Sequence, residues 1–420
     1  MNTLVQRLKT AFADETLRKR ILFVFGALLA FRVLAVVPIP SIDALRLQEF
    51  FANNQFLGLL NIFSGGGLSN LSIVMLGVGP YITAAIIMQL LSAMVPKIKA
   101  MYHEEGQAGR QKFTQYSRLL TIPLGTLQAF GFLMLLQRQG VIGMLSPVEF
   151  ATNVIVITAG AVFLMWIGEL ISEFGIGNGV SLLIFAGIIA QLPSAISQLL
   201  FTYDPTMLPT YIGFLAAAAI IVFGIVYVNE AERPIPITYA KQARGFRKQQ
   251  GDTHLPLRVN QAGVMPIIFA LSILLFPQMM INFFAGPQTT GGIVGFILGV
   301  MENMWIYGAI YFILVFLFTY FYTAITFEVE SVAENLQKTG AFIPGVRPGQ
   351  TTIEYISTIL TRITFIGGVF LGLIAILPII MQAITGLQTL AIGGTALLIV
   401  VAVVVDFVKR LDAQIAMREY

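Results

Sequence analysis

The strongest constraint on the fold is a stretch of 47 residues, 50–96, that carries no formal charge. A single membrane-spanning helix needs only about 20 apolar residues. We therefore predict one span at 71–91 and, before it, a short re-entrant helix that the glycine-rich residues 64–67 join to the span. Non-helical backbone is tolerated at membrane depth only where protein buries it or where it lines a watery cavity. The sequence therefore predicts that the rest of the chain encloses a cavity.

The composition places the whole chain in the membrane class. Of the 420 residues, 57% are hydrophobic and 11% are charged, whereas soluble domains carry about 25% charged residues. The absence of cysteine excludes disulfides, thiolate catalysis and cysteine-ligated metals. The first 20 residues form a charged, polar tail with no small-residue cleavage site after the apolar run that follows, so we expect the first span to be retained.

Uncharged or nearly uncharged runs predict ten spans. The least certain pair is the last, because 363–405 is a single uncharged run of 43 residues, which we divide at Pro378 and at the turn-like residues 385–388. The predicted spans are 21–38, 71–91, 119–136, 151–169, 179–200, 210–229, 263–281, 303–326, 363–380 and 388–406.

The distribution of basic residues predicts the orientation. Of the 25 Lys and Arg residues, Arg46 and Arg138 fall in loops on one side and Arg32 lies within the first span. Positive charge marks the cytoplasmic side, so both termini are predicted to be cytoplasmic. The other 22 lie in the N-terminal tail, at 97–118, at 233–258, at 338–362 and in the C-terminal tail.

Ten spans can form two halves of five, 1–200 and 201–420, and an odd number of spans gives the second half the opposite orientation. Inverted repeats place the working site at their interface, often on helices interrupted by glycine and proline. The second and seventh spans are such a pair, with GlyValGlyPro at 77–80 and AlaGlyValMetPro at 262–266. The symmetry is a hypothesis, since no further repeat is apparent.

Enzyme chemistry has almost no place in this sequence. The two histidines, His103 and His254, fall in predicted cytoplasmic loops, and the metalloprotease, serine-hydrolase and nucleotide-binding motifs are missing. We therefore expect no enzymatic activity, no metal site and no cofactor. The GlyIleGlyAsnGly segment at 175–179 is predicted to be a turn that opens the fifth span.

Ion-coupled transport also lacks its usual groups, because such relays use acids or histidine inside the bilayer. Arg32 is the one ionisable residue predicted deep within a span. Arg32 either has a functional role or, because it lies only six residues before Pro38, extends its charged end to the outer membrane interface. A secondary transporter of a small solute remains the alternative function, since broken helices and inverted topology allow it.

Aliphatic residues stand beside the glycine and proline breaks, and periodicity does not separate a packing role from a pore-lining one. Two cytoplasmic loops are longer than a connection requires: 230–262, with two strand-like pieces around a basic tip, and 327–357, with two prolines around Arg347. Their basic residues either set orientation or dock nucleic acid, anionic lipid or a protein.

Six motifs, taken together and in order, resemble the SecY family, the central subunits of the bacterial Sec protein translocon. The resemblance extends from the N-terminal tail to beyond Asp406. It implies an all-α polytopic membrane protein, with ten transmembrane helices in two inverted five-helix halves around a central hourglass pore and with a re-entrant plug helix. The motifs are NIFSGGGLSNLSI (61–73), GVGPYITAAIIMQLL (77–91), EEGQAGRQKFTQY (104–116), FGIGNGVSLLIFAGI (174–188), GAFIPGVRPGQTT (340–352) and GGTALLIVVAVVVDF (393–407).

The resemblance also implies roles for individual residues. The pore ring would be Val78, Ile82, Ile184, Ile188, Ile268 and Ile399. The plug, 56–68, would include Phe56, Leu57, Leu60, Asn61, Phe63, Ser64, Gly65, Gly66, Gly67 and Leu68. The lateral gate, between spans 2/3 and 7/8, would include Thr83, Ile86, Gln89, Leu90, Asn260 and Phe269. Cytoplasmic partners would dock on Lys241, Arg244, Arg247, Lys248 and Arg347.

The function implied is a protein-conducting channel in the bacterial cytoplasmic membrane. It would pass unfolded secretory polypeptides and release hydrophobic segments sideways into lipid. Because the chain has no nucleotide-binding motif, the driving force must come from outside. The resemblance implies the following partners: the small membrane subunits SecE and SecG, the SecA ATPase, the ribosome, polypeptides that bear signal sequences, the lipid bilayer and other membrane insertion factors.

Overall fold

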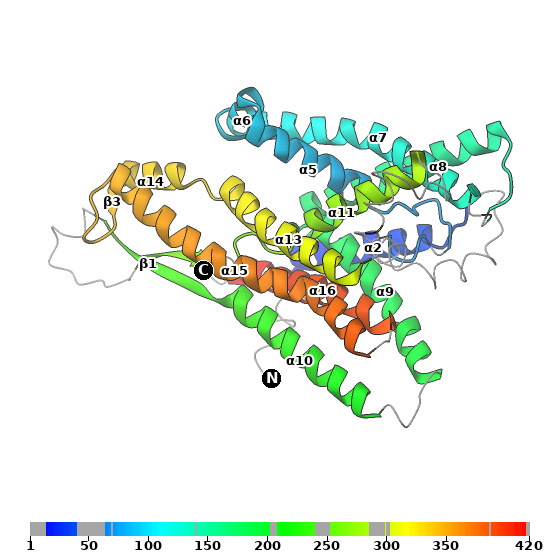
Figure 1. Cartoon of the computed structure of the whole chain (residues 1–420). Helices are drawn as coiled ribbons and strands as arrows, with labels where there is room; N and C mark the ends of the chain where they lie inside the picture. Colours follow the sequence, from blue (N-terminus) through cyan, green and yellow to red (C-terminus); the bar gives the residue numbers. More distant parts are fainter. Residues whose placement is uncertain are drawn as a thin grey trace.

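The computed structural model describes residues 14–39, 64–68, 70–138, 140, 142–201, 208–239, 253–284, 299, 303–385 and 388–416. It is predominantly helical (Figure 1), as predicted. Each of the ten predicted spans overlaps one long helix. These are α2 (Glu15–Leu34), α5 (Gly79–Met94), α7 (Gly106–Arg138), α8 (Pro147–Phe174), α9 (Gly179–Phe201), α10 (Leu208–Glu230), α11 (Met265–Phe284), α13 (Met304–Thr326), α15 (Gln350–Thr385) and α16 (Gln388–Ala416).

Several helices are long and apolar enough to cross a bilayer. Among the described residues, four of them, α7, α8, α13 and α15, meet both conditions. A fifth candidate is α5 taken together with α6 (Pro96–His103), two helices that meet at a bend of 111°. Shorter apolar stretches lie in α9, α10 and α11. The chain is therefore a multi-pass membrane protein.

Polar residues immediately before the helices explain where several of them begin. Asp14 accepts hydrogen bonds from the backbone of Thr16 and Leu17 at the start of α2. Ser146 and Glu149 form a reciprocal capping box at the start of α8. Asn178 Oδ1 accepts hydrogen bonds from the backbone N–H groups of Val180 and Ser181 in the first turn of α9. This confirms that 175–179 is the turn that opens this helix. These groups satisfy backbone N–H donors that have no partner within the helix.

The prediction for the second span is partly wrong. Residues 70–78 form a succession of turns, and α5 begins only at Gly79. Gly77 has a φ of 57°, in the left-handed region that favours glycine, and Pro80 lies in the first turn of the helix. The start of α11 repeats this arrangement, because Gly263 has a φ of 60° and Pro266 again lies in the first turn.

The prediction that Pro378 separates the last two spans is also wrong. Helix α15 continues through Pro378 to Thr385, and α16 begins at Gln388 within the predicted turn 385–388. A proline inside a membrane helix is tolerated where neighbouring groups satisfy the freed carbonyl. Helix α15 also begins at Gln350, inside the predicted loop 327–357. Its first turns pack on a small core that includes Ile235, Leu257 and Ile343, and this core stabilises helix beyond the apolar run.

A small sheet forms from the two long loops. Its order is β2 (Thr253–Arg258), β1 (Glu232–Tyr239), β3 (Ala341–Phe342), with both pairs antiparallel. This confirms the two strand-like pieces of loop 230–262, while the basic tip at 240–252 lies outside the described residues. Helix α14 (Val329–Lys338) packs beside β3 and α15. In Figure 1 this sheet and α14 lie toward the left of the molecule, whereas α6 lies at its upper edge.

The largest buried cluster joins residues from α2, α5, α8, α9, α10, α11, α13, α15 and α16. Large apolar side chains on the outer faces remain exposed, for example Leu29 on α2, Phe223 on α10 and Ile366 on α15. An apolar exterior is the composition expected where lipid covers the helices. The six predicted ring residues belong to this cluster, as do Ile86 and Phe269 of the predicted gate.

Candidate functional site

The six residues of the predicted pore ring come together in one place. Ile82 lies on α5, with Val78 just before its first turn, Ile184 and Ile188 lie on α9, Ile268 lies on α11, and Ile399 lies on α16. All six belong to the same buried cluster, and each is at most 7% exposed. Four helices therefore contribute these aliphatic side chains to one buried cluster.

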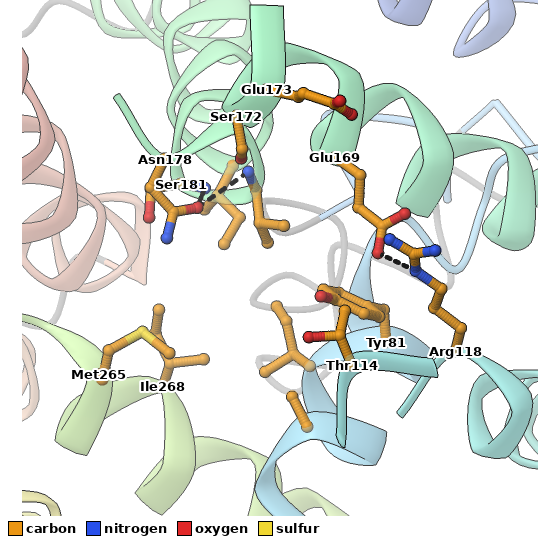
Figure 2. A pocket seen from close by; sticks show the side chains of 14 residues that line it. Tyr81, Thr114, Arg118, Glu169, Ser172, Glu173, Asn178, Ser181, Met265 and Ile268 are labelled. Atoms are coloured by element: carbon orange, nitrogen blue, oxygen red, sulfur yellow. Dashed lines mark hydrogen bonds and ion pairs between the residues drawn. The ribbon is translucent and has the colours of Figure 1, made fainter. Parts of the chain in front are cut away.

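A cavity of about 450 Å³, lined by both apolar and polar residues, opens against this ring. Ile82, Ile184 and Ile268 form part of its wall. Figure 2 shows Met265 and Ile268 of α11 on one side and the polar residues on the others. The polar lining residues are Tyr81, Thr114, Arg118, Glu169, Ser172, Glu173, Asn178 and Ser181.

An ion pair forms part of the cavity wall. The Nε of Arg118 on α7 lies 2.6 Å from Oε1 of Glu169 on α8 (Figure 2). The side chains are 45% and 17% exposed, so water reaches both groups. The sequence places both residues at the ends of predicted spans, but it gives no sign that they meet.

The glycine joint at 64–67 packs beside the ring, on backbone from α9. Residues 64–68 are buried and form turns rather than helix. Gly65 has a φ of 67°, and a Cβ built there would lie 2.6 Å from Cζ of Phe31 and 3.0 Å from Cα of Gly187. Gly187 immediately precedes the ring residue Ile188. Ser64, Gly66, Gly67 and Leu68 complete the described part of the predicted plug, while Phe56, Leu57, Leu60, Asn61 and Phe63 lie outside the described residues.

The side chain of Arg32 turns toward this joint. Its Nη1 donates a hydrogen bond of 2.6 Å to the carbonyl oxygen of Gly65. The next part of the chain is paired with the end of α2 through backbone bonds: Ile39 N donates to Leu71 O at 2.8 Å, and Ile73 N donates to Val37 O at 3.0 Å. The first helix and the joint therefore form one connected unit.

The predicted lateral gate falls on a seam between two pairs of helices. Helix α5 packs mainly on α7 and α11 mainly on α13, while α5 and α11 share only a small contact. On one side of the seam, Ile86 is buried, Leu90 is partly buried and Thr83 donates to the Gly79 carbonyl at 3.0 Å. On the other, Phe269 is 1% exposed and makes edge-to-face contacts with Phe318 and Tyr322 of α13.

The two polar residues of the predicted gate each retain an unpaired oxygen. Gln89 Oε1 and Asn260 Oδ1 are buried without a hydrogen-bond partner in the described structure. Asn260 Nδ2 donates to Asn229 Oδ1 at 2.8 Å and to the Gly263 carbonyl at 3.2 Å. No direct bond joins Gln89 to Asn260 among the described contacts. A buried acceptor without a partner carries a free-energy cost, so these two oxygens reduce the stability of the residues predicted to form the gate.

A second polar cavity, of about 330 Å³, borders Asn260 and shares Asn178, Ser181 and Met265 with the first. Its rim carries two ion pairs, Lys409 with Glu230 at 3.0 Å and Arg410 with Asp406 at 2.8 Å. The two cavities are therefore neighbours, and of the two the first is the one lined by ring residues.

Of the predicted docking residues, Arg347 is exposed in the turn between β3 and α15. Its carbonyl accepts a hydrogen bond from Thr352 Oγ1 at 2.9 Å, which shapes the turn. Lys241, Arg244, Arg247 and Lys248 lie outside the described residues. The described residues contain no cluster of three side chains that are able to hold a metal ion.

Comparison with known proteins agrees with the resemblance of the motifs. A family model described as SecY matches residues 72–408. The protein translocase subunit SecY of Synechocystis is 38% identical over 99% of this chain and 98% of its own length. A solved structure of a protein-conducting channel superposes with a TM-score of 0.67 at 18% identity, covering 94% of this chain and 92% of that one. A second solved structure is that of a SecY protein, whose plug domain is described as stabilising the closed channel and maintaining a membrane seal. It superposes with a TM-score of 0.66 at 19% identity, covering 94% of this chain and 92% of that one.

Proposed function

The chain belongs to the SecY family and is a protein-conducting channel, and we propose that its six-residue aliphatic ring is the constriction through which unfolded polypeptides cross the membrane. The observation that carries this proposal is the convergence of Val78, Ile82, Ile184, Ile188, Ile268 and Ile399 from four helices into one buried cluster beside a polar cavity.

The chemistry of the ring suits an unselective polypeptide pore. A translocating chain presents every kind of side chain, so a constriction with fixed charges or specific donors would bind some of them. Hydrophobic constrictions gate by losing water, which blocks ions. Flexible aliphatic side chains can then move apart around a polypeptide. The polar cavities would keep the approach to the ring wet.

The joint and the residues before it would act as the plug. Gly65 packs on Gly187, next to Ile188 of the ring. A movement of the joint would therefore change the packing beside the proposed constriction. The plug named in the similar SecY structure supports this role. We infer that residues 56–68 block the external funnel in the resting channel.

The seam between α5/α7 and α11/α13 would form the lateral gate. A hydrophobic signal segment of about 20 residues prefers lipid, whereas a charged residue costs about 2.5 to 3.5 kcal/mol at the centre of a membrane helix. An opening at the seam would let each segment partition between the pore and lipid. The small contact between α5 and α11 supports this position for the opening.

We further propose that the two halves, 1–200 and 201–420, are inverted repeats. The matching starts of α5 and α11 support this relation, since each has a glycine with a φ near 60°, then valine, with proline three residues after the glycine. The gate would then lie at the interface between the halves, as repeat transporters and channels place their working sites.

The cytoplasmic side would carry the β1–β3 sheet, α14 and the basic loops, with both termini on that side of a bacterial cytoplasmic membrane. The exposed Arg347 and the basic tip, including Lys241, Arg244, Arg247 and Lys248, would dock SecA or the ribosome. A ribosome–channel complex that contains the similar Sec61 supports the second partner. SecE and SecG would cover lipid-facing helices as membrane subunits.

Reconstitution tests the function directly. The purified chain, with SecE and SecG in proteoliposomes, should make a secretory precursor resistant to added protease when SecA and ATP are supplied. A precursor whose signal sequence carries a charged residue should remain accessible. Uptake of a small solute without any precursor translocation would contradict the proposal and favour a secondary transporter.

A further inference from the structure

We propose that Arg32 is a positioning residue that holds the glycine joint at 64–67 in its closed arrangement through the carbonyl of Gly65. This inference rests on the proposed function, because it assigns the joint to the plug of the channel. It gives a role to a charge that the sequence leaves unexplained.

The first step is the contact itself. Arg32 lies near the end of α2, is partly buried, and donates from Nη1 to the Gly65 carbonyl oxygen at 2.6 Å. Among the described residues, this is the one hydrogen bond that the guanidinium makes. A charged side chain inside a membrane helix is costly unless it has a partner or reaches water. The carbonyl provides that partner at a point where the backbone is not helical.

The second step is the fit around Gly65. Its left-handed φ of 67° turns the peptide away from helical geometry, and a Cβ there would collide with the ring of Phe31, the residue before Arg32. Two successive residues of α2 therefore hold the joint, Phe31 by its shape and Arg32 by its hydrogen bond. A glycine is required because no other residue leaves room for the Phe31 ring.

The third step is what the bond controls. Residues 71–73 are fixed to 37–39 by two backbone hydrogen bonds, and Asn70 Nδ2 donates to the Ala35 carbonyl at 3.4 Å. The part of the chain after the joint is thus anchored to the end of α2. The joint is also bonded to this anchored segment, because Gly66 O accepts from Asn70 N at 3.3 Å and Gly67 O accepts from Ser72 N at 2.8 Å. The Arg32 bond adds a direct tie from α2 to Gly65, so we expect its release to loosen the joint at Gly65 while residues 71–73 stay paired with 37–39.

The fourth step is the strength of the bond. An arginine that binds a carboxylate forms two parallel charge-assisted bonds, which are strong and geometrically specific. Arg32 forms one bond to a neutral carbonyl, which is weaker. A single bond of this kind is suited to a contact that must hold at rest and break when a polypeptide enters.

The experiment uses the absence of cysteine from the chain. Ser64→Cys introduces a single thiol at a position that is 1% exposed, and its rate of reaction with a water-soluble maleimide reports opening of the joint. The full chain with its membrane subunits is labelled in detergent. Arg32→Met should raise the labelling rate about tenfold. The reason is that loss of a hydrogen bond from a charged donor shifts the equilibrium between the closed and the open joint by about a factor of ten.

Two variants serve as controls. Arg32→Lys retains a cationic donor on a long side chain, so its labelling rate should stay within about threefold of the parent rate. This increase is smaller than the roughly tenfold increase expected for Arg32→Met, which loses the charged donor. Arg20→Met makes the same chemical change at the exposed start of α2 and should label like the parent. Methionine inserts into a membrane more readily than arginine, so Arg32→Met should not fail at insertion. Equal melting temperatures for the two Met variants would separate local opening from unfolding.

The second readout is the ion conductance of the resting channel in a planar bilayer, which should rise in Arg32→Met. Unchanged labelling and unchanged conductance in that variant, in a preparation whose parent translocates precursor, would overturn the role of Arg32. Equal labelling of Arg32→Lys and Arg32→Met would also overturn it. A parent that translocates no precursor would instead contradict the proposed function, so the two failures are distinguishable.

Discussion

Arg118 and Glu169 meet across two neighbouring helices at the wall of the cavity that Ile82, Ile184 and Ile268 also line, with Nε and Oε1 2.6 Å apart. The pair joins α7 to α8 beside the ring residue Ile82 in the same cavity. Because both groups are in contact with water, their attraction is weakened by solvent and salt.

A double-mutant cycle should therefore give a small coupling. Arg118→Gln, Glu169→Gln and the double variant, compared by thermal unfolding in detergent, should yield a coupling free energy of about 0.5 to 1 kcal/mol. The pair Lys112 and Glu105, at 3.5 Å and with both side chains more exposed, is the control and should yield almost none. Strictly additive effects for Arg118 and Glu169 would show that the close contact does not stabilise the protein.

Polar substitution in the ring should make the channel leak. Ile82→Asn and Ile268→Asn each introduce a side chain that retains water at the constriction, so resting ion conductance should rise and rejection of defective signal sequences should weaken. Ile82→Leu keeps the volume and the apolar character and should behave like the parent. Normal conductance and normal rejection in both Asn variants would count against the ring.

Removing the unpaired oxygen from the gate should strengthen the closed seam. Gln89→Leu replaces a side chain whose buried Oε1 has no partner in the described structure, and should stabilise the protein by about 1 kcal/mol. The tighter seam should slow translocation of precursors with weakly hydrophobic signals.

Asn153→Leu is the matched control for the gate. Asn153 also carries a buried unpaired group, Nδ2, but it lies on α8 next to Val154, which belongs to a different buried cluster from Ile86 and Phe269. This variant should gain stability without a change in translocation. Equal effects of the two variants on translocation would remove the special role of Gln89.

Gly160 should be intolerant of a side chain. A Cβ on this residue of α8 would collide with the carbonyl oxygen of Ile73, in the turn segment that leads into α5. Gly160→Ala should cost about 1 to 3 kcal/mol of unfolding free energy, as overpacking does. Gly213→Ala on α10, where nothing lies within 4 Å of the added Cβ, should instead be neutral or gain up to about 1 kcal/mol. Thermal unfolding of the two variants, side by side, measures the contrast.

Arg347→Glu should reduce SecA-dependent translocation, because it reverses the charge of an exposed side chain in a rigid turn that is proposed to dock a cytoplasmic partner. SecA affinity and precursor translocation should fall together. Lys338→Glu reverses a charge on neighbouring α14 and should have a smaller effect. If affinity and translocation are both normal in Arg347→Glu, the residue serves only to set topology.

Much of the architecture was predictable because long uncharged runs in the sequence indicate membrane helices. All ten predicted spans overlap a helix, and the strand-like pieces of 230–262 do pair as β1 and β2. The two errors concern residues 71–78 and Pro378. Residues 71–78 are as apolar as a helix but form turns that are held by pairing with 37–39, and Pro378 is accommodated within α15. For 71–78, tertiary pairing overrides the local signal.

The candidate site was predictable only through its resemblance to a family. Periodicity alone does not distinguish Ile82, which belongs to the ring cluster, from Ile366, which is 61% exposed on α15. Both are aliphatic residues in apolar helices. The pairing of Arg118 with Glu169, 51 positions apart, and the contact of Arg32 with Gly65, 33 positions apart, carry no signal in a single sequence.

The sequence by itself determined that this chain crosses the membrane many times, where its helices would fall and that its breaks are made of glycine and proline, because the transfer of charge and of free backbone groups into lipid is costly whatever the fold. Only the tertiary structure decided which aliphatic side chains face one another and which partner the buried arginine takes. Those choices depend on how the helices pack, and apolar side chains gain almost as much from lipid as from one another.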